Sequence, residues 1–123
     1  MAVVLIVEDD PQVLVLAESV LQEFGCKTIS AATEAEAQAI IHSGQVLDLL
    51  FTDIDLNDHR EGGVTVGQVL GQSRKEVPVL YTGGRGLTDG MQALFVDRSS
   101  FLPKPYRAEQ LAEAVAELLS SPS

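Results

Sequence analysis

The sequence predicts an α/β protein whose parallel sheet is covered by helices on both faces. Short apolar runs rich in β-branched residues recur at even spacing along the chain, and segments with helical periodicity lie between them. Five such runs alternate with about five helical segments. Strands that alternate with helices form parallel sheets, because each helix carries the chain back across a face of the sheet.

The first strand–helix unit has clear signals. Val3–Val7 is a continuous β-branched run, typical of a strand that is buried on both faces. Asp10 and Pro11 predict the start of a helix, because Asp caps a helix N-terminus and Pro suits the first turn. Gly25 lies where this helix should end, and Lys27–Ala31 can form the second strand.

The middle of the chain repeats the pattern. Thr33 and Glu36 form a capping box that opens a second helix, which Gly44 ends. Val46–Thr52 is expected to be the third strand. Val64–Leu70 begins a third helix, which nearby glycines weaken.

The last third is less regular. Val77–Thr82 predicts the fourth strand, with a proline near its start. The segment 83–97 has four glycines among its first eight residues, so we expect its helix to be short or mobile. Phe101–Leu102 marks a short fifth strand, and Tyr106–Leu119 predicts a final amphipathic helix.

Composition sets limits on function. The chain has 123 residues, the size of one domain, and we expect residues 1–123 to form a single domain. A net charge of −10 disfavours binding to nucleic acid or to an anionic membrane. The lone Cys26 cannot form an internal disulfide, and no apolar run approaches the length of a membrane span. We therefore expect a cytoplasmic protein without membrane insertion.

Side chains able to carry chemistry follow the ends of four predicted strands. They are Glu8, Asp9, Asp10, Asp53, Asp55, Thr82 and Lys104. The ends of parallel strands meet at one edge of the sheet, so carboxylates gathered there would repel one another. Mg²⁺ would relieve this repulsion, because it prefers carboxylate, carbonyl and phosphate oxygens. A carboxylate beside Mg²⁺, a hydroxyl and an ammonium can accept a phosphoryl group.

Four segments carry a resemblance to a known family. They are VLIVEDDP, LLFTDIDL, VPVLYTGG and FLPKPY, each at the end of a predicted strand. Together they resemble the receiver (CheY-like) domain of bacterial two-component response regulators, over essentially the whole chain. The resemblance implies a flavodoxin-like (βα)5 three-layer sandwich with strand order 2-1-3-4-5. It also implies Mg²⁺ as cofactor and a sensor histidine kinase or histidine phosphotransfer protein as partner, with an unknown downstream protein.

The resemblance assigns roles at the metal site. Asp53 would be the phosphoacceptor and a metal ligand. Asp9 would bind Mg²⁺ directly, and Glu8 would act mainly through a coordinated water. The backbone carbonyl of Asp55 would supply a further ligand. Asp10 is an additional acid, which we interpret as the cap of the first helix.

It also assigns roles around the phosphoryl group. Thr82 would hydrogen-bond one phosphoryl oxygen and Lys104 would pair with another. Phe101 would be the switch aromatic, which turns inward when the threonine moves. The bond between Lys104 and Pro105 corresponds to one that is usually cis in the family.

The sequence departs from the family pattern in two places. Asn57 stands where the family usually has proline, and the loop Asn57–Gly63 is longer than usual. Asp97–Ser100 replaces the small residues that usually precede the fifth strand. These differences lie near the rim of the site and on the phosphorylation-sensitive face, so the output surface is expected to be unconventional.

Two alternatives remain open. Asp53-Ile54-Asp55 fits the DxD motif of haloacid-dehalogenase-type phosphatases, although that family places it on the first strand. A degenerate receiver could instead bind partners without phosphorylation. The complete set of acids, threonine and lysine favours a phosphoryl acceptor with at most slow self-dephosphorylation, rather than an enzyme.

Overall fold

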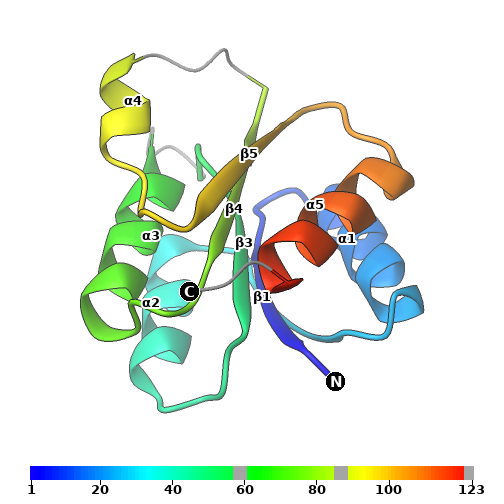
Figure 1. The fold of residues 1–123 in the computed structure, drawn as a ribbon, viewed down its shortest axis with the longest axis horizontal. Coiled ribbons are helices and arrows are strands. Elements are labelled where there is room, and N and C mark those ends of the chain that lie inside the picture. The colour runs from blue at the N-terminus through cyan, green and yellow to red at the C-terminus, as the bar shows by residue number, and fades with distance from the viewer. Residues whose placement is uncertain (57–60, 85–88, 121–123) are drawn as a thin grey trace.

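The computed structural model describes residues 1–56, 61–84 and 89–120. Within them, five parallel strands form one sheet in the order β2-β1-β3-β4-β5, which confirms the predicted order (Figure 1). The strands are β1 (Val3–Val7), β2 (Lys27–Ala31), β3 (Leu49–Asp53), β4 (Val79–Gly83) and β5 (Ser99–Pro103).

Helices cover both faces of the sheet, as predicted. They are α1 (Pro11–Glu23), α2 (Glu34–His42), α3 (Gly62–Ser73), α4 (Asp89–Ala93) and α5 (Ala108–Ser120). Helices α1 and α5 lie together on one face, and α2 and α3 lie together on the other (Figure 1). The result is the three-layer sandwich that the alternating pattern indicated.

Local sequence signals explain where the first helices begin and end. The Asp10 carboxylate accepts hydrogen bonds from two main-chain amides of the first turn of α1, which confirms its capping role. The Thr33 hydroxyl accepts a hydrogen bond from the amide of Glu36 at the start of α2. Gly25 and Gly44 follow the two helices with φ of +93° and +84°, a left-handed conformation that favours glycine.

Some boundaries differ from the sequence prediction. The third strand begins at Leu49 rather than Val46, because Asp48 pairs with Val3 through both its amide and its carboxylate and ends the ladder there. The fifth strand extends over Ser99–Pro103, beyond the predicted Phe101–Leu102. Helix α4 has only five residues, which confirms a short fourth helix. The adjoining residues 85–88 lie outside the described part.

Two apolar cores sandwich the sheet. Tyr81 belongs to the core beneath α2 and α3, where its ring stacks on Phe95 with centroids 3.9 Å apart. Leu80 and Leu102 belong to the core beneath α1 and α5. These cores hold the strand ends rigidly at one edge of the sheet. Of the helices in the described part of the chain, none combines the length and apolar character needed to span a bilayer.

Candidate functional site

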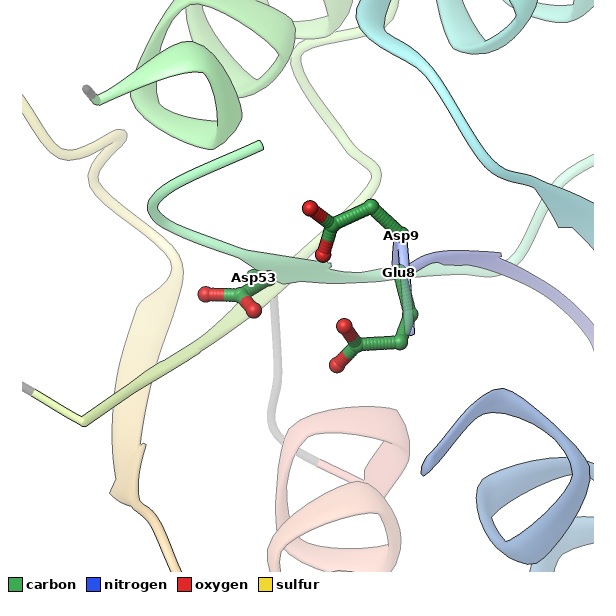
Figure 2. A group of neighbouring side chains, drawn as sticks. All are labelled: Glu8, Asp9 and Asp53. Carbon is green, nitrogen blue, oxygen red and sulfur yellow. The ribbon is translucent and has the colours of Figure 1, made fainter. Parts of the chain in front are cut away.

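Three carboxylates gather at the C-terminal edge of the sheet. Glu8 and Asp9 directly follow β1, and Asp53 ends the neighbouring strand β3. One oxygen of each lies within 4.8 Å of the others. Figure 2 shows the three groups around one space, with the Asp9 carboxylate on the side of α3 and the Glu8 carboxylate on the side of α5. Glu8 and Asp53 are buried, and Asp9 is half-buried.

Lys104 neutralises part of this negative charge. Its Nζ lies 2.8 Å from Oε1 of Glu8 and 2.7 Å from Oδ2 of Asp53. Burial alone would lower the pKa of Lys104, but its hydrogen bonds to Asp53 and Glu8 raise it above the ordinary value. The ammonium is therefore charged at neutral pH, and it contacts two of the three carboxylates.

Burial has the opposite consequence for Glu8. It raises the pKa of this carboxyl above its ordinary value, and the hydrogen bond from Lys104 offsets only part of that effect. The remaining oxygen, Oε2, accepts a hydrogen bond from the amide of Asp10 at 3.1 Å. An additional cation at this edge would stabilise the ionised form of Glu8.

Backbone contacts hold the other acids in place. Oδ1 of Asp53 accepts a hydrogen bond from the amide of Asp55 at 3.2 Å. Oδ1 of Asp55 accepts one from the amide of Glu61 at 2.9 Å, next to the start of α3. The Asp55 side chain thus joins β3 to α3, while the use of its carbonyl as a metal ligand stays a prediction. Residues 57–60 of the long loop lie outside the described part.

Thr82 and Phe101 lie beside the acids on β4 and β5. Thr82 is paired with Asp53 in the sheet register and is buried. Its hydroxyl donates a hydrogen bond to the carbonyl of Leu102 at 2.5 Å, so it is engaged with β5. Phe101 is half-buried and packs against the core that contains Tyr81. The structure places Thr82 beside Asp53 and pairs Phe101 with Tyr81, one residue before Thr82, and the roles of both residues on phosphorylation stay predictions.

The oxygen ligands suit a hard divalent cation. Carboxylate oxygens from two adjacent strands lie within reach of one another, and Mg²⁺ is bound by one or two carboxylates with water and phosphate oxygens. Carboxylates gathered at one edge of the sheet favour such an ion electrostatically. The donor set therefore fits Mg²⁺.

Residues 4–116 match the family model for the response regulator receiver domain. The chain belongs to this family. Receiver domains generally bind Mg²⁺ at an acidic cluster and interact with histidine kinases or phosphotransfer proteins, and membership of this family is consistent with two-component signalling. The cis bond between Lys104 and Pro105, expected from the resemblance, is confirmed.

Curated relatives are longer regulators. The receiver domain is 33% identical over 116 residues to the response regulator protein PilR of Pseudomonas aeruginosa, an alignment that covers 94% of this chain and 25% of PilR. It is 28% identical over 109 residues to the nitrogen assimilation regulatory protein NtrX of Azorhizobium caulinodans, covering 88% of this chain and 24% of NtrX. The chain thus spans about a quarter of the length of these relatives.

Solved structures agree with the fold. A response regulator receiver protein from Sinorhizobium medicae superposes with a TM-score of 0.89 at 27% identity, covering 98% of this chain and 95% of that protein. The receiver domain of the hybrid histidine kinase CckA superposes with a TM-score of 0.79 at 27% identity, covering 97% of this chain and all of that domain.

Two features of this receiver domain were not found from the sequence. The first is the close approach of α3 to β3: a Cβ at Gly63 would lie 1.7 Å from the carbonyl oxygen of Asp53. The amide of Gly63 also donates to the carbonyl of Ile54 at 2.8 Å. Glycine repeats at four-residue steps along α3, which was the available signal, but the strand it approaches depends on tertiary packing.

The second feature is Tyr106, which the sequence indicated only as a helix start. Its ring packs edge-on against Phe51 of β3, with centroids 5.9 Å apart. The pKa of its phenol is raised to about 12, chiefly by burial and then by the negative charge of Glu8. The hydroxyl is therefore protonated and a hydrogen-bond donor at neutral pH.

Proposed function

We propose that Asp53 accepts a phosphoryl group from a phosphohistidine on a sensor histidine kinase or a histidine phosphotransfer protein. The observation that supports this most directly is the position of Lys104, whose ammonium lies 2.7 Å from Oδ2 of Asp53 within a group of three carboxylates. A buried carboxylate that contacts a fixed cation is held in one orientation, as a nucleophile must be.

Different residues of this chain would have different roles in the phosphoryl transfer. An Asp53 oxygen attacks phosphorus, the bond between phosphorus and the donor imidazole nitrogen breaks, and the imidazole leaves with the bonding electrons. Lys104 needs only a small displacement to pair with a phosphoryl oxygen, because its Nζ already contacts Asp53. Thr82 would exchange the Leu102 carbonyl for another phosphoryl oxygen. Bound Mg²⁺ would neutralise charge on the transferring oxygens.

The same residues divide the binding of Mg²⁺. Asp9, Asp53 and the carbonyl of Asp55 would hold it directly, and Glu8 would act through a coordinated water. The proximity of Glu8, Asp9 and Asp53 supports this arrangement. The phosphoryl group adds a charge of about −1.5 to −2, which biases a protein-binding surface toward a second arrangement.

We propose that the chain acts by switching in the cytoplasm, not by turnover. Asp55, the candidate second residue of a phosphatase DxD motif, has its Oδ1 engaged by the amide of Glu61. That contact supports a structural role for its carboxylate over a general acid. Self-dephosphorylation would then be slow, and a downstream protein would read the phosphorylated state.

Intact mass spectrometry tests the proposal. The protein is incubated with Mg²⁺ and acetyl phosphate, as wild type, as Asp53→Asn and as the control Asp48→Asn, whose residue lies just before the other end of β3. We expect one phosphoryl adduct on wild type and on the control, and none on Asp53→Asn or with EDTA. No adduct with steady phosphate release would favour the phosphatase. No adduct and no turnover, even with a phosphorylated phosphotransfer protein as donor, would favour a phosphorylation-independent module.

A further inference from the structure

The hydroxyl of Tyr106 is buried, and it makes no hydrogen bond to another described residue. Within the described part of the chain, this oxygen is enclosed and has no hydrogen-bond partner. Buried polar groups are nearly always paired, because an unpaired one loses its bonds to water without compensation. Phenylalanine would make the same ring contact with Phe51 without this cost. We therefore expect this hydroxyl to have a hydrogen-bond partner in another conformational state of the protein.

The position of Tyr106 identifies the group it can serve. It follows Lys104 by two residues, and its ring packs on Phe51, two residues before Asp53. Among the charges acting on its hydroxyl, that of Glu8 is the strongest. The Glu8 carboxylate lies on the α5 side of the site (Figure 2). Tyr106 packs against the core beneath α1 and α5, which is the same side of the sheet.

Space is available for a small movement on this side. A cavity of about 380 Å³ borders Tyr106 at the junction of α1 with the segment that precedes α5. It is lined by Val13, Leu16, Gly84, Lys104, Pro105 and Tyr106. A local rotation of Lys104 or Tyr106 can therefore occur without displacing the packed core.

Lys104 pairs with two carboxylates, and phosphorylation of Asp53 would draw its ammonium away from the other one, Glu8. Its Nζ is shared between Oε1 of Glu8 and Oδ2 of Asp53. A phosphoryl group on Asp53 would draw the ammonium toward its oxygens, and Oε1 of Glu8 would lose the hydrogen bond that Lys104 donates to it. A buried carboxylate that loses a donor is strongly destabilised unless another replaces it.

We propose that Tyr106 is a positioning residue that donates a hydrogen bond to Glu8 when Lys104 moves to the phosphoryl group. The inference rests on the proposed function of Asp53. In the unphosphorylated state the Tyr106 hydroxyl makes no hydrogen bond to a described residue, and the Lys104 ammonium pairs with the Glu8 carboxylate. In the phosphorylated state the phenol takes over, Glu8 keeps its orientation toward the metal, and Lys104 is released for the phosphoryl oxygens.

The test compares Tyr106→Phe with Tyr81→Phe. Tyr81 is the other buried tyrosine, it lies on the opposite face of the sheet, and its hydroxyl accepts a hydrogen bond from the amide of Val96. Two quantities are measured for each protein: the urea midpoint without ligand, and the affinity for beryllium fluoride with Mg²⁺. Beryllium fluoride mimics a phosphoryl group on a carboxylate.

For Tyr106→Phe we expect an unchanged or higher urea midpoint and about tenfold weaker binding of beryllium fluoride, the factor typical of one hydrogen bond to a charged group. For Tyr81→Phe we expect a lower midpoint and wild-type binding. Wild-type affinity in Tyr106→Phe would overturn the inference, and so would a lower midpoint without ligand, because the hydroxyl would then already have a partner.

A double-mutant cycle with Glu8→Gln identifies the group through which the hydroxyl acts. If it acts through the Glu8 carboxylate, Tyr106→Phe should weaken beryllium fluoride binding less in the Glu8→Gln background than in wild type. Equal weakening in both backgrounds would contradict this role. If wild type itself fails to bind beryllium fluoride, the proposed function of Asp53 fails and this inference falls with it. Binding by wild type with no effect of Tyr106→Phe refutes this inference alone.

Discussion

The hydroxyl of Thr82 donates a hydrogen bond to the main-chain carbonyl of Leu102, with the two oxygens 2.5 Å apart. Thr82 is also paired with Asp53 in the register of β3 and β4. The residue thus has β3 on one side and β5 on the other. In the proposed phosphorylated state its hydroxyl would reach a phosphoryl oxygen only by giving up β5, so we expect phosphorylation to be coupled to the backbone of β5 through this hydrogen bond.

Substituting Thr82 by valine removes this coupling at nearly constant volume. We expect Thr82→Val to lower the free energy of unfolding by about 1 kcal/mol, the typical value of one hydrogen bond. Asp53 should still be phosphorylated, but hydrogen exchange in β5 should no longer respond to beryllium fluoride. Thr28→Val, on the outer strand β2, is the control. A wild-type exchange response in Thr82→Val would rule out this coupling.

Substituting Lys104 by methionine leaves two buried carboxylates without their cation. In EDTA at pH 7 we expect Lys104→Met to lose about 3 kcal/mol of unfolding free energy, because an unpaired buried charge is costly. The loss should shrink at acidic pH as Glu8, whose pKa burial raises, becomes protonated, and Mg²⁺ should restore part of it. The exposed Lys75→Met is the control. Equal stability of Lys104→Met and wild type would show that the two ion pairs contribute nothing.

The same stability comparison at high pH tests how much the charge of Lys104 contributes to the free energy of unfolding. The pKa of Lys104 is raised in the folded state above its ordinary value of 10.5. Its contribution to stability is therefore complete below that value and is lost as pH rises through the folded-state pKa. Wild type should lose this contribution at high pH, and Lys104→Met should not.

Glu8 should show the reverse behaviour in the absence of metal. Burial raises its pKa, so the ionised carboxylate costs stability above its folded-state pKa and costs nothing below the ordinary value of 4.5. In EDTA we expect Glu8→Gln to be more stable than wild type at pH 7, with a difference that disappears as pH falls toward 4.5. Urea unfolding at several pH values measures this. A pH-independent difference would contradict it.

Gly63 should tolerate no side chain. A Cβ there would lie 1.7 Å from the Asp53 carbonyl oxygen, whereas a Cβ at Gly84 would meet nothing within 4 Å. We expect Gly63→Ala to lower the unfolding free energy by about 3 kcal/mol or more and to weaken Mg²⁺ binding, because α3 must move away from the end of β3. Gly84→Ala should resemble wild type in both. Calorimetric titration and urea unfolding give the two readouts, and a stable Gly63→Ala with normal Mg²⁺ affinity would contradict this.

Much of the fold could be predicted because its signals are local. The β-branched run Val3–Val7 and the cap at Asp10 each depend on a few neighbouring residues, and the structure has both as predicted. The predicted start of the third strand was wrong because the observed start depends on a contact with a residue far away in the sequence. Asp48 pairs with Val3, 45 residues away, and nothing in the run from Val46 indicates this contact.

The site could be predicted as a set of residues but not as a set of contacts. Strand ends placed Glu8, Asp53 and Lys104 on one edge, and the structure brings them together. That Lys104 is shared between two carboxylates depends on side-chain rotamers. The unpaired hydroxyl of Tyr106 likewise depends on how its ring packs against Phe51, which no sequence period encodes.

The separation of the site's residues along the chain has a consequence for synthesis. Asp53 is followed by Lys104 only after 51 further residues, and Glu8 precedes that lysine by 96. A chain emerging from the ribosome can therefore pair β1 with β3, and bring their acids together, well before the cation exists. An intermediate that pairs these two strands would hold their acids together without Lys104, which directly follows β5 and is their counter-ion in the folded domain. The order of these residues along the chain therefore predicts that this ion pairing forms only after the fifth strand has been synthesised.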